Sequence, residues 1–409
     1  MARKKRVKGN AKAKEKFMQI FAEVRWKHRF DAEPACQHFE ECGGCSLQQH
    51  SYEQQLEIKK QALERLVRET PGMSSLAKLE VEAVASARDY KYRQRMDFIV
   101  TPEGSGQRRC DGQKGIVELN ECSLVEDENY AIYAKTLELS REVGLEAYDQ
   151  NKYYGCLRYI IIRRTRSGQQ LVSLLTTSSA DEAKLEQIAQ KLLDEGVQSV
   201  YWNVNDNRLD DSLGECRKFW GQEFITENLL GRDFILGPLT FFQANHEVAS
   251  AAYSSVRDFI QECQPKKIHD LYSGTCTMPV IFGDLVDSVT AVENFPENVR
   301  MAEKNLKTNG IENVKLIEQD VAEFLKQSDI DMEFSVLNPP RKGMHEQALR
   351  RILELAPDNL AYLSCSPRSL LEDLGILFRE YKPLKIQLFD MFPQTEHFET
   401  LVLLTKKGR

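Results

Sequence analysis

The stretch that decides the fold is Lys267-Ile268-His269-Asp270-Leu271-Tyr272-Ser273-Gly274-Thr275-Cys276-Thr277. It begins as a buried strand over residues 267–272 and ends in a polar turn around Gly274. Helical and strand-like segments alternate after it, which predicts a parallel sheet covered by helices on both faces. An introductory helix is expected over residues 248–260, and further strands at 289–293, 314–317, 334–337 and 360–364. The expected fold class is therefore α/β, with a doubly wound, nucleotide-type sheet in the C-terminal half.

Polar residues follow the first two strands at the edge where open α/β sheets bind ligands. Gly274 allows a close approach of the backbone to a ligand. Glu293 lies about 20 residues further on, where an acidic side chain binds ribose hydroxyls in dinucleotide folds. The G-x-G-x-x-G pattern of NAD sites is absent, so S-adenosylmethionine (SAM) is the favoured adenosine-containing cofactor. The alternative is an ordinary strand end with a solvated Glu293.

Two later strand ends carry groups suited to recognition and catalysis. Asn338 precedes Pro339 and Pro340, and its side-chain amide offers both a donor and an acceptor. Cys365 follows the strand 360–364, ahead of a helix that we expect to start near Ser369. A helix N-terminus lowers the pKa of a nearby thiol, which favours a nucleophilic role for Cys365. A buried, inert cysteine is the alternative.

Acid and imidazole groups lie close to the last predicted strand. Glu399 directly precedes its apolar residues, so partial burial is expected to raise the pKa of this carboxyl towards the range of a general base. His397 is the competing candidate base, whereas Glu396 is expected to be solvated.

The ten cysteines include one tight group. Structural disulfides are not expected, because the cytosol keeps thiols reduced. The pattern Cys36-x5-Cys42-Gly-Gly-Cys45 predicts a metal site completed by a distant cysteine. Cys122 is preferred to Cys110, which lies in a glycine-rich turn. Zinc and a [4Fe-4S] cluster both accept four thiolates, so the spacing leaves both open.

Charge is distributed unevenly along the 409 residues, whose net charge is -7. The first sixteen residues carry eight Lys and Arg against one Glu, which makes a basic tail on an acidic body. Such a tail either contacts RNA phosphates in a salt-sensitive way or is simply solvated. No stretch approaches the ~20 apolar residues of a membrane span, and no secretory signal is evident. We expect a cytoplasmic protein that is not membrane-bound.

The chain is expected to have four parts. Residues 1–30 form the basic tail, and residues 31–80 hold the cysteine group and a helix. Residues 81–237 form a central, mostly β domain with one helix near 180–195, and residues 238–409 bind the cofactor.

Seven motifs occur in an order that resembles the SAM-dependent RNA uridine-5-methyltransferases, which make 5-methyluridine in tRNA and 23S ribosomal RNA. The resemblance spans nearly the whole chain. The motifs are C-x5-C-G-G-C with a downstream cysteine, Phe241-Phe242-Gln243-Ala244-Asn245, Asp270-Leu271-Tyr272-x-Gly274, Glu293, Asn338-Pro339-Pro340-Arg341-Lys342-Gly343, Ser364-Cys365-Ser366-Pro367, and Asp390-Met391-Phe392-Pro393-Gln394-Thr395-x-His397-x-Glu399.

The resemblance implies a class I SAM methyltransferase domain and specific residue roles. It assigns Cys365 as the nucleophile that adds to uracil C6 and Glu399 as the base that removes the C5 proton. The target base would have to leave its stack to reach the thiol. It also implies that Cys36, Cys42, Cys45 and Cys122 hold a [4Fe-4S] cluster. The SAM site would be lined by Gln243, Tyr272, Glu293 and Asn338, and Asp320 would contact the adenine amino group of SAM.

The same motifs indicate a branch of the family, and they leave alternatives for the RNA substrate and for catalytic activity. The Asn338-Pro339-Pro340 variant and the short segment before Cys36, with no TRAM domain, are similar to the shorter 23S ribosomal RNA branch. We therefore expect a monomer that methylates structured RNA, with 23S ribosomal RNA preferred and tRNA as the alternative. Cys276 replaces a family glycine beside the cofactor, which is the best argument for a catalytically silent RNA-binding homologue. A small-molecule methyltransferase would not account for the cysteine group and the basic tail.

Overall fold

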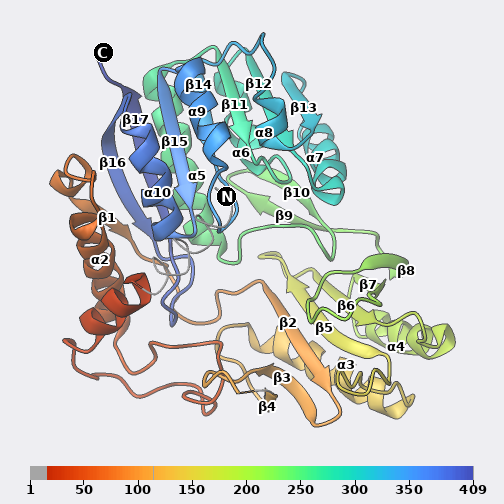
Figure 1. Ribbon diagram of the computed structural model, residues 1–409. Coiled ribbons are helices and arrows are strands. Elements are labelled where there is room, and N and C mark those ends of the chain that lie inside the picture. The colour runs from red at the N-terminus through yellow and green to blue at the C-terminus, as the bar shows by residue number, and fades with distance from the viewer. Residues whose placement is uncertain (1–15, 114, 409) are drawn as a thin grey trace. The chain divides into compact units, whose positions relative to one another are not determined.

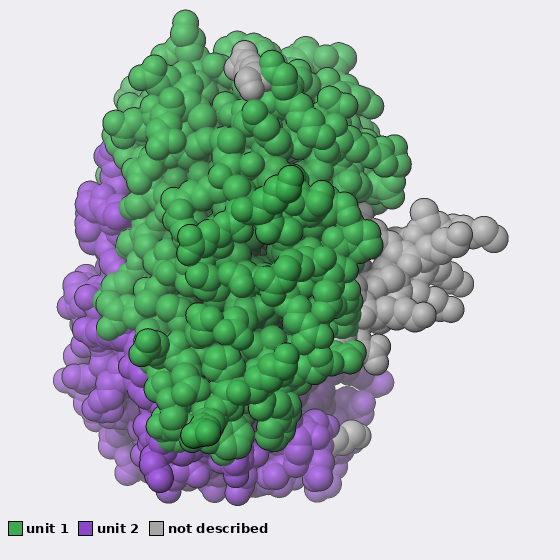
Figure 2. All heavy atoms as spheres, turned by 90° about the vertical axis from the view of Figure 1, so that its left-hand side faces the viewer, with its two compact units in different colours: residues 1–32, 49–87, 247–409 green, residues 33–48, 88–246 purple. Residues whose placement is uncertain are grey.

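The computed structural model describes residues 16–113 and 115–408. The predicted RNA contact of the basic tail depends on residues 1–15 and so lies outside the described residues. The chain divides into two compact units, coloured green and purple in Figure 2. Unit 1 comprises residues 1–32, 49–87 and 247–409, and unit 2 comprises residues 33–48 and 88–246. The units alternate along the chain, and the four-part division expected from the sequence stays a prediction.

Unit 1 is built on one eight-stranded sheet with the order β1-β16-β17-β15-β14-β11-β12-β13 (Figure 1). Strands β11 to β15 run parallel, as the sequence predicts, whereas β17 runs antiparallel to β15 and to β16. The strands are β1 (Val81–Val84), β11 (Lys267–Leu271), β12 (Ser288–Glu293), β13 (Val314–Glu318), β14 (Phe334–Leu337), β15 (Asn359–Ser364), β16 (Tyr381–Phe389) and β17 (Glu399–Lys406).

Helices connect and flank these strands. The sequence of α5, the expected introductory helix, explains why it forms a helix with one buried face. Its apolar residues recur every three or four positions and are buried. Helix α10 begins with Pro367, and Ser366 before it accepts a hydrogen bond from the Ser369 backbone N–H. The helices of unit 1 are α2 (Tyr52–Glu69), η1 (Leu76–Lys78), α5 (His246–Cys263), α6 (Thr277–Phe282), η2 (Gly283–Leu285), α7 (Pro296–Thr308), α8 (Val321–Phe324), α9 (Glu346–Leu355) and α10 (Pro367–Leu377), and residues 16–25 are also helical.

Strand β1 differs from the sequence-based expectation. The sequence places residues 81–84 at the start of the central domain, but they pair in parallel with β16, with Val81 opposite Ile386. A strand of four residues has too little periodicity to identify its sheet. Its partner also lies far along the chain, so only the fold reveals the pairing.

Unit 2 holds a seven-stranded sheet with the order β4-β3-β2-β5-β6-β7-β8 and a separate hairpin of β9 and β10. Its mostly β character agrees with the sequence, and so does helix α4. The elements are β2 (Arg95–Thr101), β3 (Gly104–Arg108), β4 (Ile116–Glu118), α3 (Asp127–Glu142), β5 (Leu157–Arg164), β6 (Gln170–Thr176), α4 (Glu182–Asp194), β7 (Ser199–Val204), β8 (Glu215–Gly221), β9 (Ile225–Leu229) and β10 (Arg232–Leu236).

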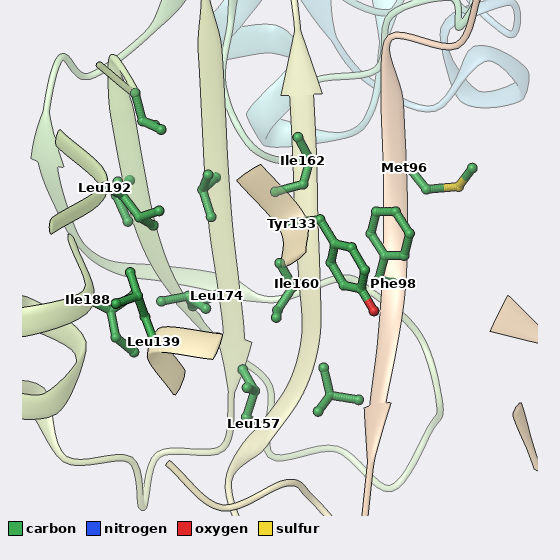
Figure 3. Packing of buried hydrophobic residues seen from close by; sticks show 14 of the residues in the cluster. Met96, Phe98, Tyr133, Leu139, Leu157, Ile160, Ile162, Leu174, Ile188 and Leu192 are labelled. Atoms are coloured by element: carbon green, nitrogen blue, oxygen red, sulfur yellow. The ribbon is translucent and has the colours of Figure 1, made fainter. Parts of the chain in front are cut away.

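Helix α3 is absent from the sequence-based prediction. Its buried positions include Asn129, Thr136 and Ser140, so the apolar stripe that reveals a helix is interrupted. In the core, Tyr133 of α3 stacks on Phe98 of β2, with ring centroids 3.6 Å apart. Figure 3 shows this pair beside the isoleucines of β5. Helix α3 is therefore an integral part of the unit 2 core.

Among the described residues, no helix is both long enough and apolar enough to cross a membrane.

Candidate functional site

The turn after β11 has an unusual backbone. Tyr272, Gly274 and Cys276 all have positive φ, of 65°, 57° and 57°. Non-glycine residues adopt this left-handed conformation only when their surroundings hold them in it. The Gly274 N–H donates to Oε2 of Glu293 at 2.9 Å, which ties the turn to the end of β12.

Glu293 is held by backbone amides from two segments. Its Oε1 accepts the N–H groups of Asn294 and Phe295, at 2.9 and 2.8 Å. Because a carboxylate oxygen accepts two hydrogen bonds, Oε2 retains one free position for a ligand. Asn338 joins the same edge, since its backbone N–H donates to the Leu271 carbonyl at 3.3 Å. Three of the four predicted SAM residues, Tyr272, Glu293 and Asn338, thus gather at the carboxyl ends of β11, β12 and β14.

All the predicted cofactor contacts stay predictions, and two of them lie elsewhere. Gln243 is buried but belongs to unit 2. Asp320 caps helix α8, with its Oδ1 accepting the N–H groups of Ala322 and Glu323 at 2.8 and 3.2 Å.

Asp270 is a buried carboxyl to which the sequence analysis assigned no role. Neither of its side-chain oxygens receives a hydrogen bond from any described residue. Burial, with a smaller effect from Glu293, raises its pKa to about 8. The Cys276 thiol lies close enough for burial and the charge of Asp270 to raise its pKa as well. A charged residue inside the apolar strand β11 was the signal that could have identified Asp270.

Cys365 and Glu399 come together through the register of two neighbouring strands. Ser364 at the end of β15 pairs with Thr400 of β17, and these strands are antiparallel. The next residue beyond each, Cys365 and Glu399, therefore lies across the same strand pair. Glu399 is 4% exposed, and burial raises its pKa to about 8, in the direction that the sequence predicts.

The expected lowering of the Cys365 pKa is wrong. Burial, followed by the charge of Glu399, raises it to about 11. Desolvation of a thiolate outweighs the effect of the nearby helix N-terminus here. A hydrogen bond and the positive charge of Arg341 act in the opposite direction and favour the thiolate.

Arg341 is the residue of this site whose role the sequence analysis missed. The turn that presents it closes through the Gly343 N–H, which donates to the Pro340 carbonyl at 2.8 Å. Gly343 has a φ of 74°, and a Cβ there would lie 2.7 Å from Oδ2 of Asp373. The Ser369 hydroxyl donates to the Arg341 carbonyl at 3.0 Å. Nucleophile, carboxyl and cation are therefore presented together by β14, β15 and β17.

The competing base, His397, has a different environment. Its side chain is 50% exposed, and its Nε2 lies 4.0 Å from Oε1 of Glu396. Glu399, by contrast, is buried and its charge acts on Cys365, so Glu399 has the better position for proton removal.

The four predicted cysteine ligands line a single pocket in unit 2. Cys36, Cys42, Cys45 and Cys122 share it with Phe39, Met96, Leu119 and Leu124, among other residues. The chain can fold so tightly because Gly43 donates its N–H to the Arg108 carbonyl at 2.8 Å, and a Cβ on Gly43 would lie only 3.1 Å from that oxygen.

All four cysteines of this pocket are free thiols. Within the described part of the chain, no group of three or more His, Cys, Asp or Glu side chains is arranged to hold a metal ion. Burial raises the pKa of Cys45 to about 12 and that of Cys122 to about 11, with the neighbouring cysteines adding to both shifts. Cys110 is exposed, and its thiol donates to the Glu40 carbonyl at 2.7 Å. A role for the four cysteines as ligands stays a prediction.

Comparison with known proteins identifies the family of the chain. The model of the tRNA (uracil-5-)-methyltransferase family matches residues 51–407. An uncharacterized RNA methyltransferase of Clostridium tetani is 33% identical over 409 residues, covering 97% of this chain and 88% of that protein. The tRNA (uracil(54)-C(5))-methyltransferase of Pyrococcus horikoshii is 31% identical over 370 residues, covering 90% of this chain and 85% of that protein.

A solved structure extends the similarity to the fold. The tRNA (uracil-54, C5)-methyltransferase of Pyrococcus abyssi, in complex with S-adenosyl-L-homocysteine, superposes with a TM-score of 0.75 at 27% identity, covering 88% of this chain and 86% of that chain. The chain belongs to the tRNA (uracil-5-)-methyltransferase family of SAM-dependent RNA methyltransferases. The predicted α/β class with a class I SAM methyltransferase fold is confirmed.

Proposed function

We propose that the enzyme forms 5-methyluridine in a structured RNA, with Cys365 as the nucleophile and Glu399 as the base. The observation that carries this proposal is the β15–β17 register, which sets Cys365 and Glu399 across one strand pair. Arg341 supports the same roles, because it favours the thiolate form of Cys365.

Each residue has a defined step. Cys365 sulfur forms a bond to uracil C6, which makes C5 an enolate carbon able to attack an electrophile. SAM, when bound, supplies the methyl group that C5 takes. Glu399 then accepts the C5 proton, the C5=C6 double bond re-forms, and the C6–S bond breaks to release Cys365 as a thiolate. The nucleophile and the base are thus regenerated once Glu399 passes its proton to solvent.

The SAM site is proposed at the carboxyl ends of β11, β12 and β14. Tyr272, Glu293 and Asn338 would line it, and Oε2 of Glu293 has one lone pair left for a ribose hydroxyl. Gln243 is the fourth proposed contact, on the basis of the family motif.

We propose a [4Fe-4S] cluster for Cys36, Cys42, Cys45 and Cys122. Each of the four irons of such a cluster takes one thiolate, so the sulfurs stand further apart than around one zinc ion. The cysteine motif and the pocket that the four side chains share support this proposal. Iron and sulfide analysis with the absorption spectrum of anaerobically purified protein tests this: Cys122→Ala should lose the cluster, whereas Cys110→Ala should keep it. Stoichiometric zinc without sulfide would refute the cluster.

Two RNA classes have support as substrate. The names of the two Pyrococcus relatives support tRNA. The Asn338-Pro339-Pro340 variant, which resembles the 23S branch of the family, supports 23S ribosomal RNA. We propose that the enzyme acts in the cytoplasm as a monomer.

The deciding experiment is incubation of anaerobically purified protein with methyl-labelled SAM and unmodified transcripts of tRNA or 23S ribosomal RNA, followed by nucleoside analysis. Labelled 5-methyluridine should form on one of the two RNAs, and Cys365→Ala should abolish it. Cys263→Ala, at the end of α5, is the matched cysteine control and should keep activity. Absence of label on both RNAs would favour the catalytically silent RNA-binding alternative.

A further inference from the structure

The loop between β16 and β17 ends on the proposed base. Phe389 and Glu399 pair across the two strands and close the loop, which comprises residues 390–398. Glu399 is the first residue of β17, so its backbone position depends on how this loop is held. Helix α2, from the N-terminal part of unit 1, makes several of the contacts that hold it.

Lys59 of α2 holds the start of the loop. Its Nζ donates to Oδ1 of Asp390 at 2.6 Å and to the Phe392 carbonyl at 3.0 Å. Both charged side chains are 0% exposed. Water cannot replace either partner of a buried ion pair without opening the structure, so this pair fixes the loop against α2.

Gln55, one helical turn before Lys59, holds the middle of the loop. Its Oε1 accepts the Gln394 backbone N–H at 2.9 Å, and its Nε2 donates to Oε1 of Gln394 at 2.8 Å. The same Nε2 donates to the His50 carbonyl at 2.8 Å. Gln394 has a φ of 69°, a conformation that needs such support in a residue with a side chain.

We propose that Lys59 and Gln55 are positioning residues for Glu399. They fix the loop at Asp390, Phe392 and Gln394, and thereby keep the Glu399 carboxyl across from Cys365. This inference rests on the proposed function, because it assumes that Glu399 removes the C5 proton. It also gives α2 a place in the catalytic apparatus, although α2 precedes the β16–β17 loop by more than 300 residues.

The two halves of the reaction separate this role from a general loss of structure. Formation of the S–C6 bond and transfer of the methyl group need Cys365 and bound SAM. Removal of the C5 proton, with re-formation of the C5=C6 bond and release of the Cys365 thiolate, needs Glu399. A displaced Glu399 should therefore leave the methylated RNA covalently attached to Cys365.

The test uses Gln55→Met, which removes three hydrogen bonds without leaving a buried charge. Lys59→Met combined with Asp390→Leu is the second variant, because it neutralises both partners. Gln61→Met is the control, since Gln61 on the same helix bonds to Glu57 and His28 and not to the loop. Each full-length protein is incubated with SAM and either ordinary RNA or RNA that contains 5-fluorouridine, and the covalent complex is measured on a denaturing gel.

Fluorinated RNA reports addition and methyl transfer alone, because fluorine cannot leave C5 as a cation. We expect Gln55→Met to lower turnover on ordinary RNA by about tenfold or more, since a displacement of ~1 Å costs about 10²-fold. The covalent complex should accumulate on ordinary RNA and form at the wild-type rate on fluorinated RNA. Equal losses on both RNAs, or turnover equal to that of Gln61→Met, would overturn the positioning role. If the wild type forms no complex with fluorinated RNA, the proposed mechanism itself fails, and this inference fails with it.

Discussion

Replacing Glu399, the proposed base, should raise the free energy of unfolding, and the size of this gain should depend on pH. In Glu399→Gln, an amide of nearly the same shape replaces a carboxyl that is 4% exposed. The carboxyl ionises near 4.5 in the unfolded chain and at about 8 in the fold, because burial opposes its charge. The neutral amide has no such ionisation.

The sign and size follow from the linkage between proton binding and folding. A group with a raised folded pKa stabilises the fold fully below its unfolded pKa, and this contribution is lost as pH rises to the folded pKa. Wild type should therefore lose stability relative to Glu399→Gln between pH 4.5 and pH 8. At about 1.4 kcal/mol for each tenfold change in proton affinity, the difference above pH 8 should reach about 5 kcal/mol.

The assay is urea unfolding of both proteins under anaerobic conditions at pH 5, 7 and 9, with Glu303→Gln as the control. Glu303 is exposed on α7, and its variant should follow the wild-type pH dependence. Asp270 is present in every variant, so its own raised pKa cancels in the comparison. A stability difference that does not change between pH 5 and pH 9 would refute the claim that burial disfavours the charged form of Glu399.

Three further substitutions test other parts of the site. Arg341→Met removes the cation that lowers the thiol pKa, so the rise of kcat/KM with pH should shift to higher pH while SAM binding, measured by calorimetry, stays unchanged. Cys276 is fully buried and has a left-handed backbone conformation, which glycine tolerates better than other residues. Calorimetry should therefore show tighter SAM binding by Cys276→Gly. Gly343→Ala forces a Cβ to within 2.7 Å of Asp373 at a φ of 74°, and thermal unfolding should show a loss of about 1–3 kcal/mol together with lower activity.

The sequence was sufficient for the parallel half of the unit 1 sheet. Strands β11 to β15 are short apolar runs separated by helical patterns, and this local signal survives in the fold. The same logic located the strand ends, and with them Glu293, Asn338 and Cys365, whereas Tyr272 was assigned from the family resemblance. The sequence did not predict features that depend on residues far apart along the chain, such as the pairing of β1 with β16.

The electrostatics of the site also combine local features, which the sequence shows, with effects of distant residues, which it does not show. A helix N-terminus after Cys365 is visible in the sequence, but the depth of burial and the Glu399 charge are not, and these raise the thiol pKa. Arg341 was visible only as part of a motif, because its effect depends on the turn at Gly343 that directs it to Cys365. The sequence analysis assigned no role to Lys59 or Asp390, and only the fold shows that they form a buried ion pair.

The alternation of the two units along the chain has a consequence for biosynthesis. Unit 2 has all its residues once synthesis has passed residue 246, so its sheets can close while the rest of the chain is still being made. Unit 1 must wait, because β1 and α2 emerge early but contact β16 and the 390–398 loop, which are made last. At about 5–20 residues per second, the edge of β1 stays unpaired for at least ~15 seconds. The nascent enzyme therefore carries an open strand edge that a chaperone can bind, and its catalytic centre is the last region to assemble.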